Sequence, residues 1–150
     1  MLRAMSERVV ETRPPSFPAV RADEPILPEA GKHWQVVCGD AGHWRVGLYS
    51  PALGTAAACT ELERHDCPEF FLLLSGRVTL VLAREGKLVE VPLEAGKPVL
   101  VESPHNGFCP DGPHTGVALV VERDSFATVY RPAAAWVAGG RSAISGPVSP

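Results

Sequence analysis

The stretch of sequence that decides the fold runs from residue 61 to residue 76 and reads ELERHDCPEFFLLLSG. Because side chains alternate across a strand, a strand that runs from residue 59 to residue 65 would place Cys59, Glu61, Glu63 and His65 on one face. Glu69 then opens an apolar run that is typical of a strand buried in a barrel or sandwich. Carboxylates and an imidazole held on a rigid sheet predict a site for a hard metal ion or for acid–base chemistry.

The same alternation has a second interpretation. Leu62 would lie on the opposite face of this strand. If that face were the core, Glu61, Glu63 and His65 would point into water. The residues of this strand alone leave both orientations open.

Short strands separated by turn residues continue on both sides of this stretch. They are expected at residues 34–38, 43–49, 70–74, 78–83, 88–93, 99–101, 117–122 and 126–131. The segment around Gly86 supplies a turn that makes a hairpin of 78–83 and 88–93. Strands at this spacing, without helical periods between them, indicate an all-β sandwich or barrel.

The chain divides into three parts. Residues 1–30 contain five prolines, which fix φ and remove hydrogen-bond donors, so this part is expected to be an extended arm. The arm would lie along the barrel or reach across to a second subunit. Residues 31–131 form the barrel domain, and residues 132–150 a short helix with a flexible tail. Pro132 suits the first helical position, and Gly139–Gly140 would end the helix.

The stretch 61–76 resembles the first sequence motif of the cupin family. That motif has two histidines one residue apart, a glutamate after three or four residues, and a glycine after six more. His65, Glu69 and Gly76 have the spacing of the second histidine, the glutamate and the glycine. Glu63 stands where the first histidine is usual. A carboxylate still binds Fe²⁺, Mn²⁺ or Zn²⁺, but the replacement changes the charge of the implied site.

A weaker resemblance covers the second cupin motif. Gly96 opens the matching region and His105 closes it, with two residues fewer than usual and Glu102-Ser103-Pro104 in place of a Pro-x-Gly turn. A competing alignment would use His114, which lies too far from Gly96, so His105 is favoured. The resemblance extends over about residues 54–131.

The resemblance implies a cupin-like double-stranded β-helix, also called a jelly-roll barrel. It implies a divalent ion, Fe, Mn, Zn or Ni, and four ligands: Glu63, His65, Glu69 and His105. Glu61 would then be a candidate catalytic base on the same face. Cupin-like proteins of this size include dioxygenases, isomerases, epimerases and decarboxylases, so the implied substrate is a small organic molecule.

Two other functions remain open. The departures at Glu63 and at residues 102–104 favour a metal-free barrel that binds a small ligand. A structural or oligomer-forming module, with its cavity filled by side chains, is the third possibility.

The composition of the chain limits which partners and which cellular compartment are expected. The net charge is −3 and the 14 basic residues are scattered, which argues against a nucleic-acid partner. No apolar run approaches the ~20 residues of a membrane span, and charge comes too early for a signal peptide, so a cytoplasmic protein is expected. The four cysteines form no CxxC pair and are expected to be reduced, although their pairing stays open. A homodimer is expected because the arm could add a strand to a neighbour's sheet edge.

Overall fold

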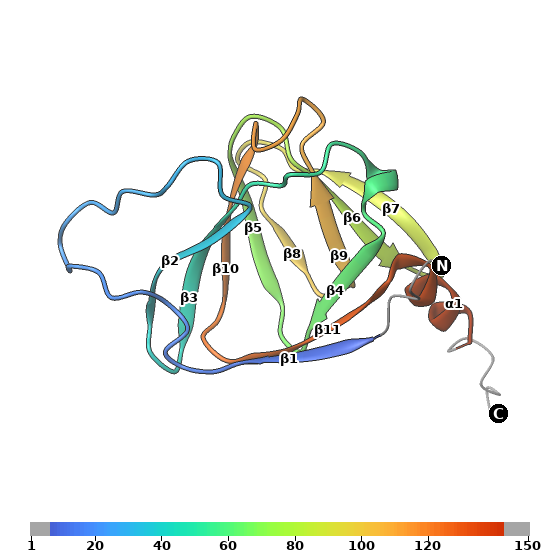
Figure 1. Cartoon of the computed structure of the whole chain (residues 1–150), viewed down its shortest axis with the longest axis horizontal. Coiled ribbons are helices and arrows are strands. Elements are labelled where there is room, and N and C mark those ends of the chain that lie inside the picture. Colours follow the sequence, from blue (N-terminus) through green and yellow to red (C-terminus); the bar gives the residue numbers. More distant parts are fainter. Residues whose placement is uncertain (1–6, 143–150) are drawn as a thin grey trace, which may run out of the picture.

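The computed structural model describes the backbone of residues 7–142 and the side chains of residues 7–138, and the expected tail at 143–150 lies outside this range. Eleven strands in the described part form two antiparallel sheets that enclose a barrel (Figure 1). The predicted all-β jelly-roll class is therefore confirmed.

The six-stranded sheet has the order β1-β11-β4-β9-β6-β7. Its strands are β1 (Arg8–Thr12), β4 (Glu61–His65), β6 (Thr79–Arg84), β7 (Lys87–Pro92), β9 (His105–Phe108) and β11 (Phe126–Pro132). The five-stranded sheet has the order β2-β3-β10-β5-β8. Its strands are β2 (Trp34–Asp40), β3 (Trp44–Tyr49), β5 (Glu69–Ser75), β8 (Val99–Val101) and β10 (Val117–Arg123). Neighbouring strands are mostly distant in sequence, as the crossovers of a jelly roll require.

Two apolar clusters hold the barrel together. The first lies between the sheets and consists of Phe71, Val78, Leu80, Leu82, Leu93, Val101, Cys109, Ala118 and Val120. The second lies between the six-stranded sheet and helix α1 (Ala133–Ser142) and consists of Cys59, Leu62, Val81, Phe108 and Ala133. Each fully buried aliphatic side chain contributes about 1.5–3 kcal/mol. Strand β6 is buried on both faces, which explains its continuous apolar sequence.

Three local predictions were wrong. Cys59 does not share a face with Glu61, because a 3₁₀ turn at Ala56–Ala58 interrupts the alternation before β4 and turns Cys59 under the helix. Pro132 is the last residue of β11 and not the first of the helix. Helix α1 continues through Gly139–Gly140 to Ser142, although two glycines are expected to weaken it there.

The N-terminal arm lies along its own barrel. Strand β1 pairs with β11, so that Val10 faces Thr128 in the register. Beyond β1, the backbone N–H groups of Ser16 and Gly42 each donate a hydrogen bond of 2.7 Å to the fully buried Asp124 carboxylate. Asp124 therefore ties the arm to the turns at the end of the barrel. Residues 17–32 then form an extended excursion beside β2 (Figure 1).

Candidate metal centre

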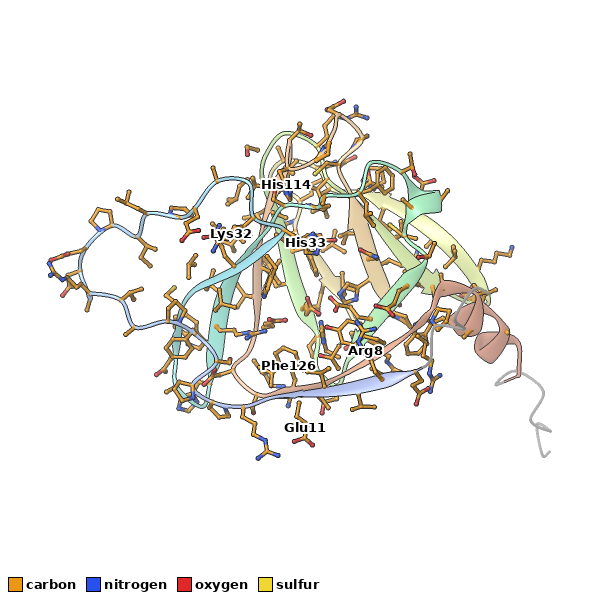
Figure 2. All side chains as sticks on the ribbon, viewed as in Figure 1. Arg8, Glu11, Lys32, His33, His114 and Phe126 are labelled. Carbon is orange, nitrogen blue, oxygen red and sulfur yellow. The ribbon has the colours of Figure 1, made fainter. Side chains whose placement is uncertain are left out.

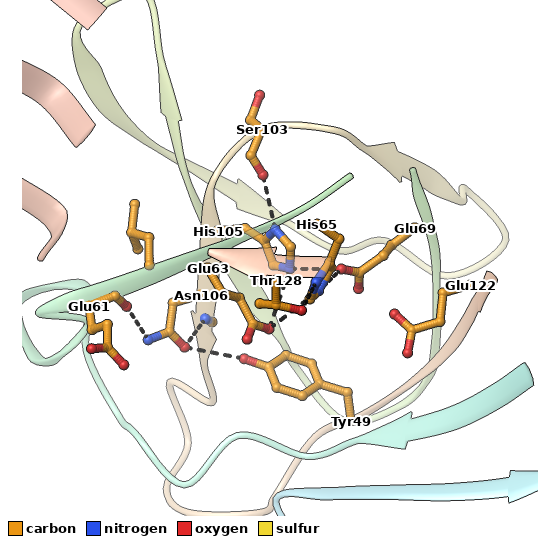
Figure 3. Close-up of polar contacts among 12 residues, drawn as sticks. Tyr49, Glu61, Glu63, His65, Glu69, Ser103, His105, Asn106, Glu122 and Thr128 are labelled. Carbon is orange, nitrogen blue, oxygen red and sulfur yellow. Dashed lines mark hydrogen bonds and ion pairs between the residues drawn. The ribbon is translucent and has the colours of Figure 1, made fainter. Parts of the chain in front are cut away.

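Four predicted ligands meet inside the barrel, from both sheets. Alternation along β4 points Glu63 and His65 into the barrel and Leu62 outward against the helix. The alternative in which Glu63 and His65 point into water is therefore wrong. His105 opens β9 and is directly opposite Glu63 in the ladder. Glu69 opens β5 in the other sheet, across the turn that follows β4. The arrangement is shown in Figure 3.

The distances within this group are short. His105 Nε2 lies 3.3 Å from Glu69 Oε1, and His65 Nε2 is in direct contact with the same oxygen. Glu63 Oε1 lies 3.7 Å from Nε2 of each histidine. Glu69 and His105 are 3% and 5% exposed, whereas Glu63 is on the open side of the group. The donor atoms of Glu63, His65 and His105 thus lie within 4.8 Å of one another, and Glu69 Oε1 lies against the Nε2 atoms of both histidines.

The hydrogen bonds of His105 determine which ring nitrogen faces this volume. Its Nδ1 lies 2.9 Å from the carbonyl oxygen of Ser103. Because a carbonyl oxygen only accepts, Nδ1 must carry the hydrogen, and the neutral ring then presents an unprotonated Nε2. Among the described residues, His105 Nε2 and Glu69 Oε1 are buried side-chain atoms without a hydrogen bond. Two lone-pair atoms at this separation need a cation or a proton between them.

His65 is held in a similar way. Its Nδ1 lies 2.7 Å from the hydroxyl oxygen of Thr128, and its ring packs edge-on against Phe126. Burial, together with the nearby His105 and Arg45, lowers the pKa of His65 to about 3. The His65 ring is therefore neutral near pH 7, which is the form that binds metals.

A fifth candidate ligand, the carboxylate of Glu122, was missed by the sequence analysis. With His65 and Glu69 it forms a second donor set whose atoms lie within 4.8 Å of one another, beside the set of Glu63, His65 and His105. The signal was available, because alternation along β10 puts Glu122 on the same inner face as the buried Ala118 and Val120.

Glu122 forms a buried ion pair with Arg45. The Nε and Nη2 atoms of Arg45 lie 2.8 Å and 2.7 Å from Glu122 Oε1, and Nη1 donates to the Ser16 carbonyl oxygen at 3.1 Å. Burial raises the pKa of Glu122, while the charge of Arg45 and its hydrogen bond act against this. Arg45 also lies over the Phe126 ring at 4.9 Å. The negative charge of Glu122 is thus already compensated within the protein.

A cavity of about 330 Å³ opens onto the candidate ligands. Part of its wall is aromatic, formed by Trp34, Tyr49, Phe71, Phe126 and Tyr130, and the arm adds Val10 and Thr12. Figure 2 shows Phe126 and Arg8 on the barrel side of β1, whereas Glu11 points away. The size suits a small organic molecule.

Tyr130 connects this wall to the ligands. Burial, the charge of Glu63 and a hydrogen bond to Glu63 raise the pKa of Tyr130 to about 12. The hydroxyl therefore keeps its proton at neutral pH, and the Glu63 carboxylate is the acceptor of its hydrogen bond. Tyr49, on the same side, has its pKa raised chiefly by burial.

Glu61 lies apart from the four candidate ligands. It lines a smaller cavity of about 160 Å³, which Glu63 and His105 also border. The Arg8 guanidinium binds both of its oxygens, at 2.7 Å and 2.9 Å. Glu61 therefore anchors β1 to β4 in this structure.

The remaining histidines and the cysteines are not part of the candidate centre. His114 binds the Ser50 carbonyl oxygen through Nδ1 at 2.7 Å in a loop outside the barrel, whereas His33 borders both cavities (Figure 2). His43 is exposed. All four cysteines are free thiols, and Cys59, Cys67 and Cys109 are buried. Within residues 7–142, no helix has the length and apolarity needed to cross a membrane.

The sequence matches no protein-family model and no curated protein. Similar solved structures include a cupin-2 domain containing protein from Shewanella frigidimarina, with 12% identity, 65% of this chain and 84% of that chain covered, and a TM-score of 0.46. Hydroxypropylphosphonic acid epoxidase from S. wedmorenis has 17% identity and a TM-score of 0.48, and the match covers 79% of this chain and 62% of the epoxidase. DMSP lyase from Ruegeria pomeroyi has 19% identity and a TM-score of 0.41, and the match covers 55% of this chain and 39% of the lyase.

The chain thus spans less than two thirds of the epoxidase and of the lyase. The two antiparallel sheets described above confirm the predicted all-β jelly-roll class. The site itself must be interpreted from the residues of this chain.

Proposed function

We propose that this barrel binds one divalent cation through Glu63, His65, Glu69 and His105 and acts on a small organic molecule. The observation that carries the proposal is the pair of buried, unbonded atoms His105 Nε2 and Glu69 Oε1, which lie 3.3 Å apart. A cation placed among the four side chains would satisfy both atoms. Glu122 is close enough to act as a further ligand.

The charges of the cavity support a divalent ion. Arg45 offsets Glu122 and the His65 imidazole is neutral near pH 7, so Glu63 and Glu69 are the two carboxylates of the proposed ligand set that have no arginine or lysine partner among the described residues. An ion of charge +2 would make the group neutral. Two carboxylate oxygens with two imidazole nitrogens favour Fe²⁺ or Mn²⁺, and Zn²⁺ and Ni²⁺ also accept such ligands.

A bound divalent ion supplies Lewis acidity, with which it polarises the oxygen atoms of a substrate. The residues of the chain prepare the site for this. The Ser103 carbonyl orients His105, and the Tyr130 hydroxyl orients Glu63. The apolar walls formed by Trp34 and Phe126 exclude water from the bound molecule. The reaction type is proposed to be that of a dioxygenase, an isomerase or an epimerase.

Glu61 is proposed as the base only for a substrate that enters the smaller cavity. There it borders the same space as Glu63 and His105. Both of its oxygens are bound by Arg8, so proton transfer to Glu61 would require this ion pair to open.

Metal analysis tests the proposal directly. The protein is purified without a chelator or a metal-affinity column, and its metal content is measured by mass spectrometry with inductively coupled plasma. Apo protein is then titrated calorimetrically with Mn²⁺, Fe²⁺, Zn²⁺ and Ni²⁺. One ion per chain in the wild type, lost in His65→Ala and kept in the exposed control His43→Ala, is the expected result. No binding of any of the four ions by the wild type would refute the proposal.

A metal-free ligand-binding barrel is the second candidate function. A proton shared between Glu69 Oε1 and an imidazole would also satisfy the two unbonded atoms, and the aromatic cavity would remain. In this case the calorimetric titration shows no heat for any ion, while small aromatic or aliphatic molecules still raise the melting temperature.

The protein is further proposed to be cytoplasmic and to function as a homodimer with a small-molecule ligand. The free thiols agree with a reducing compartment. In this structure β1 pairs with β11 of the same chain and is the end strand of the six-stranded sheet.

A further inference from the structure

The charged side chains in the wall of the larger cavity are unevenly divided between the two signs. Three carboxylates border this cavity, those of Glu63, Glu69 and Glu122, against one permanently charged cation, the guanidinium of Arg45. Within residues 7–138, no lysine and no second arginine borders it. Building on the proposed function, we infer that the larger cavity selects uncharged organic molecules and rejects anions such as carboxylates.

Arg45 is already bound to groups of the protein. Its Nε and Nη2 atoms lie 2.8 Å and 2.7 Å from Glu122 Oε1, and Nη1 donates to the Ser16 carbonyl oxygen. The side chains of Arg45 and Glu122 are 10% and 2% exposed. An anion that approached Arg45 would therefore lose its water beside the negative charge of Glu122. The arginine of the wall is thus not available as an anion-binding group.

The histidines of the wall do not supply the missing positive charge. Burial lowers the pKa of His65 to about 3, and burial and the nearby His114 lower the pKa of His33. Both rings are therefore neutral near pH 7. His105 directs its Nε2 at Glu69 Oε1, 3.3 Å away, so a proton on this nitrogen would be shared with Glu69 and not with a ligand.

A divalent ion changes the sum of the charges, but an anion remains disfavoured. Without an ion, three carboxylates and one guanidinium leave a formal charge of −2, which repels an anion. With an ion of charge +2 the sum is zero, and an anionic ligand would then add an uncompensated negative charge to a largely buried site. An uncharged carbonyl or hydroxyl oxygen can approach the same ion without this cost.

The remainder of the wall suits an uncharged molecule. Trp34, Phe71 and Phe126 provide apolar contact area. The hydroxyl of Thr12 and the ring of His33 make no side-chain hydrogen bond within the described part of the chain. Both groups are uncharged and can donate or accept a hydrogen bond, so they can bind a hydroxyl, carbonyl or amide group of a ligand.

Three probes of nearly the same shape but different charge test this inference: benzamide, benzoate and benzamidinium. Binding is measured by amide chemical-shift titration up to about 10 mM, which reaches millimolar affinities. Each probe is titrated into protein stripped of metal with a chelator and into protein loaded with Zn²⁺, whose Zn²⁺ content is measured first. Glu122→Gln leaves the charge of Arg45 unpaired, and the control Glu11→Gln makes the same exchange at the exposed pair with Arg13.

We expect benzamide to bind both forms of the wild type at least about tenfold more tightly than benzoate. Glu122→Gln should raise the affinity for benzoate about tenfold relative to benzamide, because Arg45 can then pair with the probe. Glu11→Gln should behave as the wild type does. Equal binding of benzoate and benzamide by either form of the wild type would overturn the inference, as would no binding of benzamide or no gain for benzoate in a folded Glu122→Gln. If Glu122→Gln does not fold, the wild-type series decides.

Benzamidinium separates this inference from the proposed metal site. Its positive charge should favour the metal-free protein, and bound Zn²⁺ should lower its affinity roughly tenfold. If Zn²⁺ does not bind, the proposed metal function fails, and the comparison of benzamide with benzoate on the metal-free protein still decides the inference. Tighter binding of benzoate than of benzamide to protein with verified Zn²⁺ would overturn the inference alone and leave the metal site standing.

Discussion

Glu63 on β4 and His105 on β9 are directly opposed in the antiparallel ladder, and their reactive atoms lie 3.7 Å apart. Opposed residues share one face of the sheet, so this register directs both side chains into the barrel. A substitution of Glu63 therefore changes a side chain that points at the candidate centre. The first prediction uses this position.

Glu63→His should strengthen the binding of the late transition metals, because imidazole is a softer ligand than a carboxylate. We expect the affinity for Ni²⁺ and Zn²⁺ to rise roughly tenfold or more relative to Mn²⁺. Calorimetric titration of each ion into apo protein measures this. His65→Ala should abolish binding, and unchanged affinity in both variants would show that neither side chain reaches the ion.

The stability of the apo protein should depend on His65 in acid. Burial, with help from His105 and Arg45, lowers the pKa of His65 from 6.5 in the unfolded chain to about 3. Above pH 6.5 neither state binds the proton, so His65 has no effect. Between pH 6.5 and 3 only the unfolded state binds the proton. The free energy of unfolding therefore decreases as the pH is lowered, by up to about 1.4 kcal/mol per pH unit.

Urea unfolding between pH 7 and 4, in the presence of a chelator, measures this dependence. In His65→Asn the free energy of unfolding should depend less on pH than in the wild type. In His43→Asn, which changes an exposed residue, the dependence should be that of the wild type. Parallel curves for the wild type and His65→Asn would contradict a buried neutral imidazole.

Tyr130→Phe should weaken cation binding without unfolding the barrel. The substitution removes the hydroxyl that donates to Glu63, so the carboxylate is no longer oriented toward the histidines. Loss of such an outer hydrogen bond costs about tenfold in metal affinity. Tyr49→Phe is the matched control, since the Tyr49 hydroxyl contacts Asn106 and not a candidate ligand. Equal affinities in the two variants would argue against the orienting role.

Breaking the buried pair of Arg45 and Glu122 should destabilise the fold strongly. Arg45→Met leaves Glu122 as an unpaired buried charge, which costs about 3–5 kcal/mol. The double variant Arg45→Met/Glu122→Leu should recover most of this loss, because an apolar pair replaces both charges. Arg13→Met, at an exposed ion pair with Glu11, should change stability by less than about 1 kcal/mol. Urea unfolding of the wild type and the three variants measures these free energies. A double variant that is as unstable as Arg45→Met would contradict the prediction.

Glu61→Gln should leave cation affinity within about twofold of the wild type, whereas Glu63→Gln should lower it by roughly tenfold or more. The reason is that Arg8 binds both Glu61 oxygens away from the four ligands. The two glutamates lie on the same strand, so the pair of variants is internally matched. A large loss of affinity in Glu61→Gln would place this residue among the ligands.

The parts of the site that the sequence predicted were those with a local signal. Alternation along β4 and the spacing from His65 to Glu69 depend on neighbouring residues, and the structure brings these side chains together. Arg45 and Glu122 were missed because they are 77 positions apart, and their pairing depends on how β3 registers with β10. The apolar run of β5 predicted burial correctly on its inner face only, since no local pattern tells which element covers the other face.

The two strands that complete the cavity wall, β1 and β11, come from opposite ends of the chain. The four candidate ligands, in contrast, all lie between residues 63 and 105. During synthesis the ligand-bearing strands β4, β5 and β9 leave the ribosome before β11 exists, and β1 has no strand to pair with until then. The strands that carry the candidate ligands can therefore come together before the cavity wall is complete, and the pairing of β1 with β11 closes that wall last.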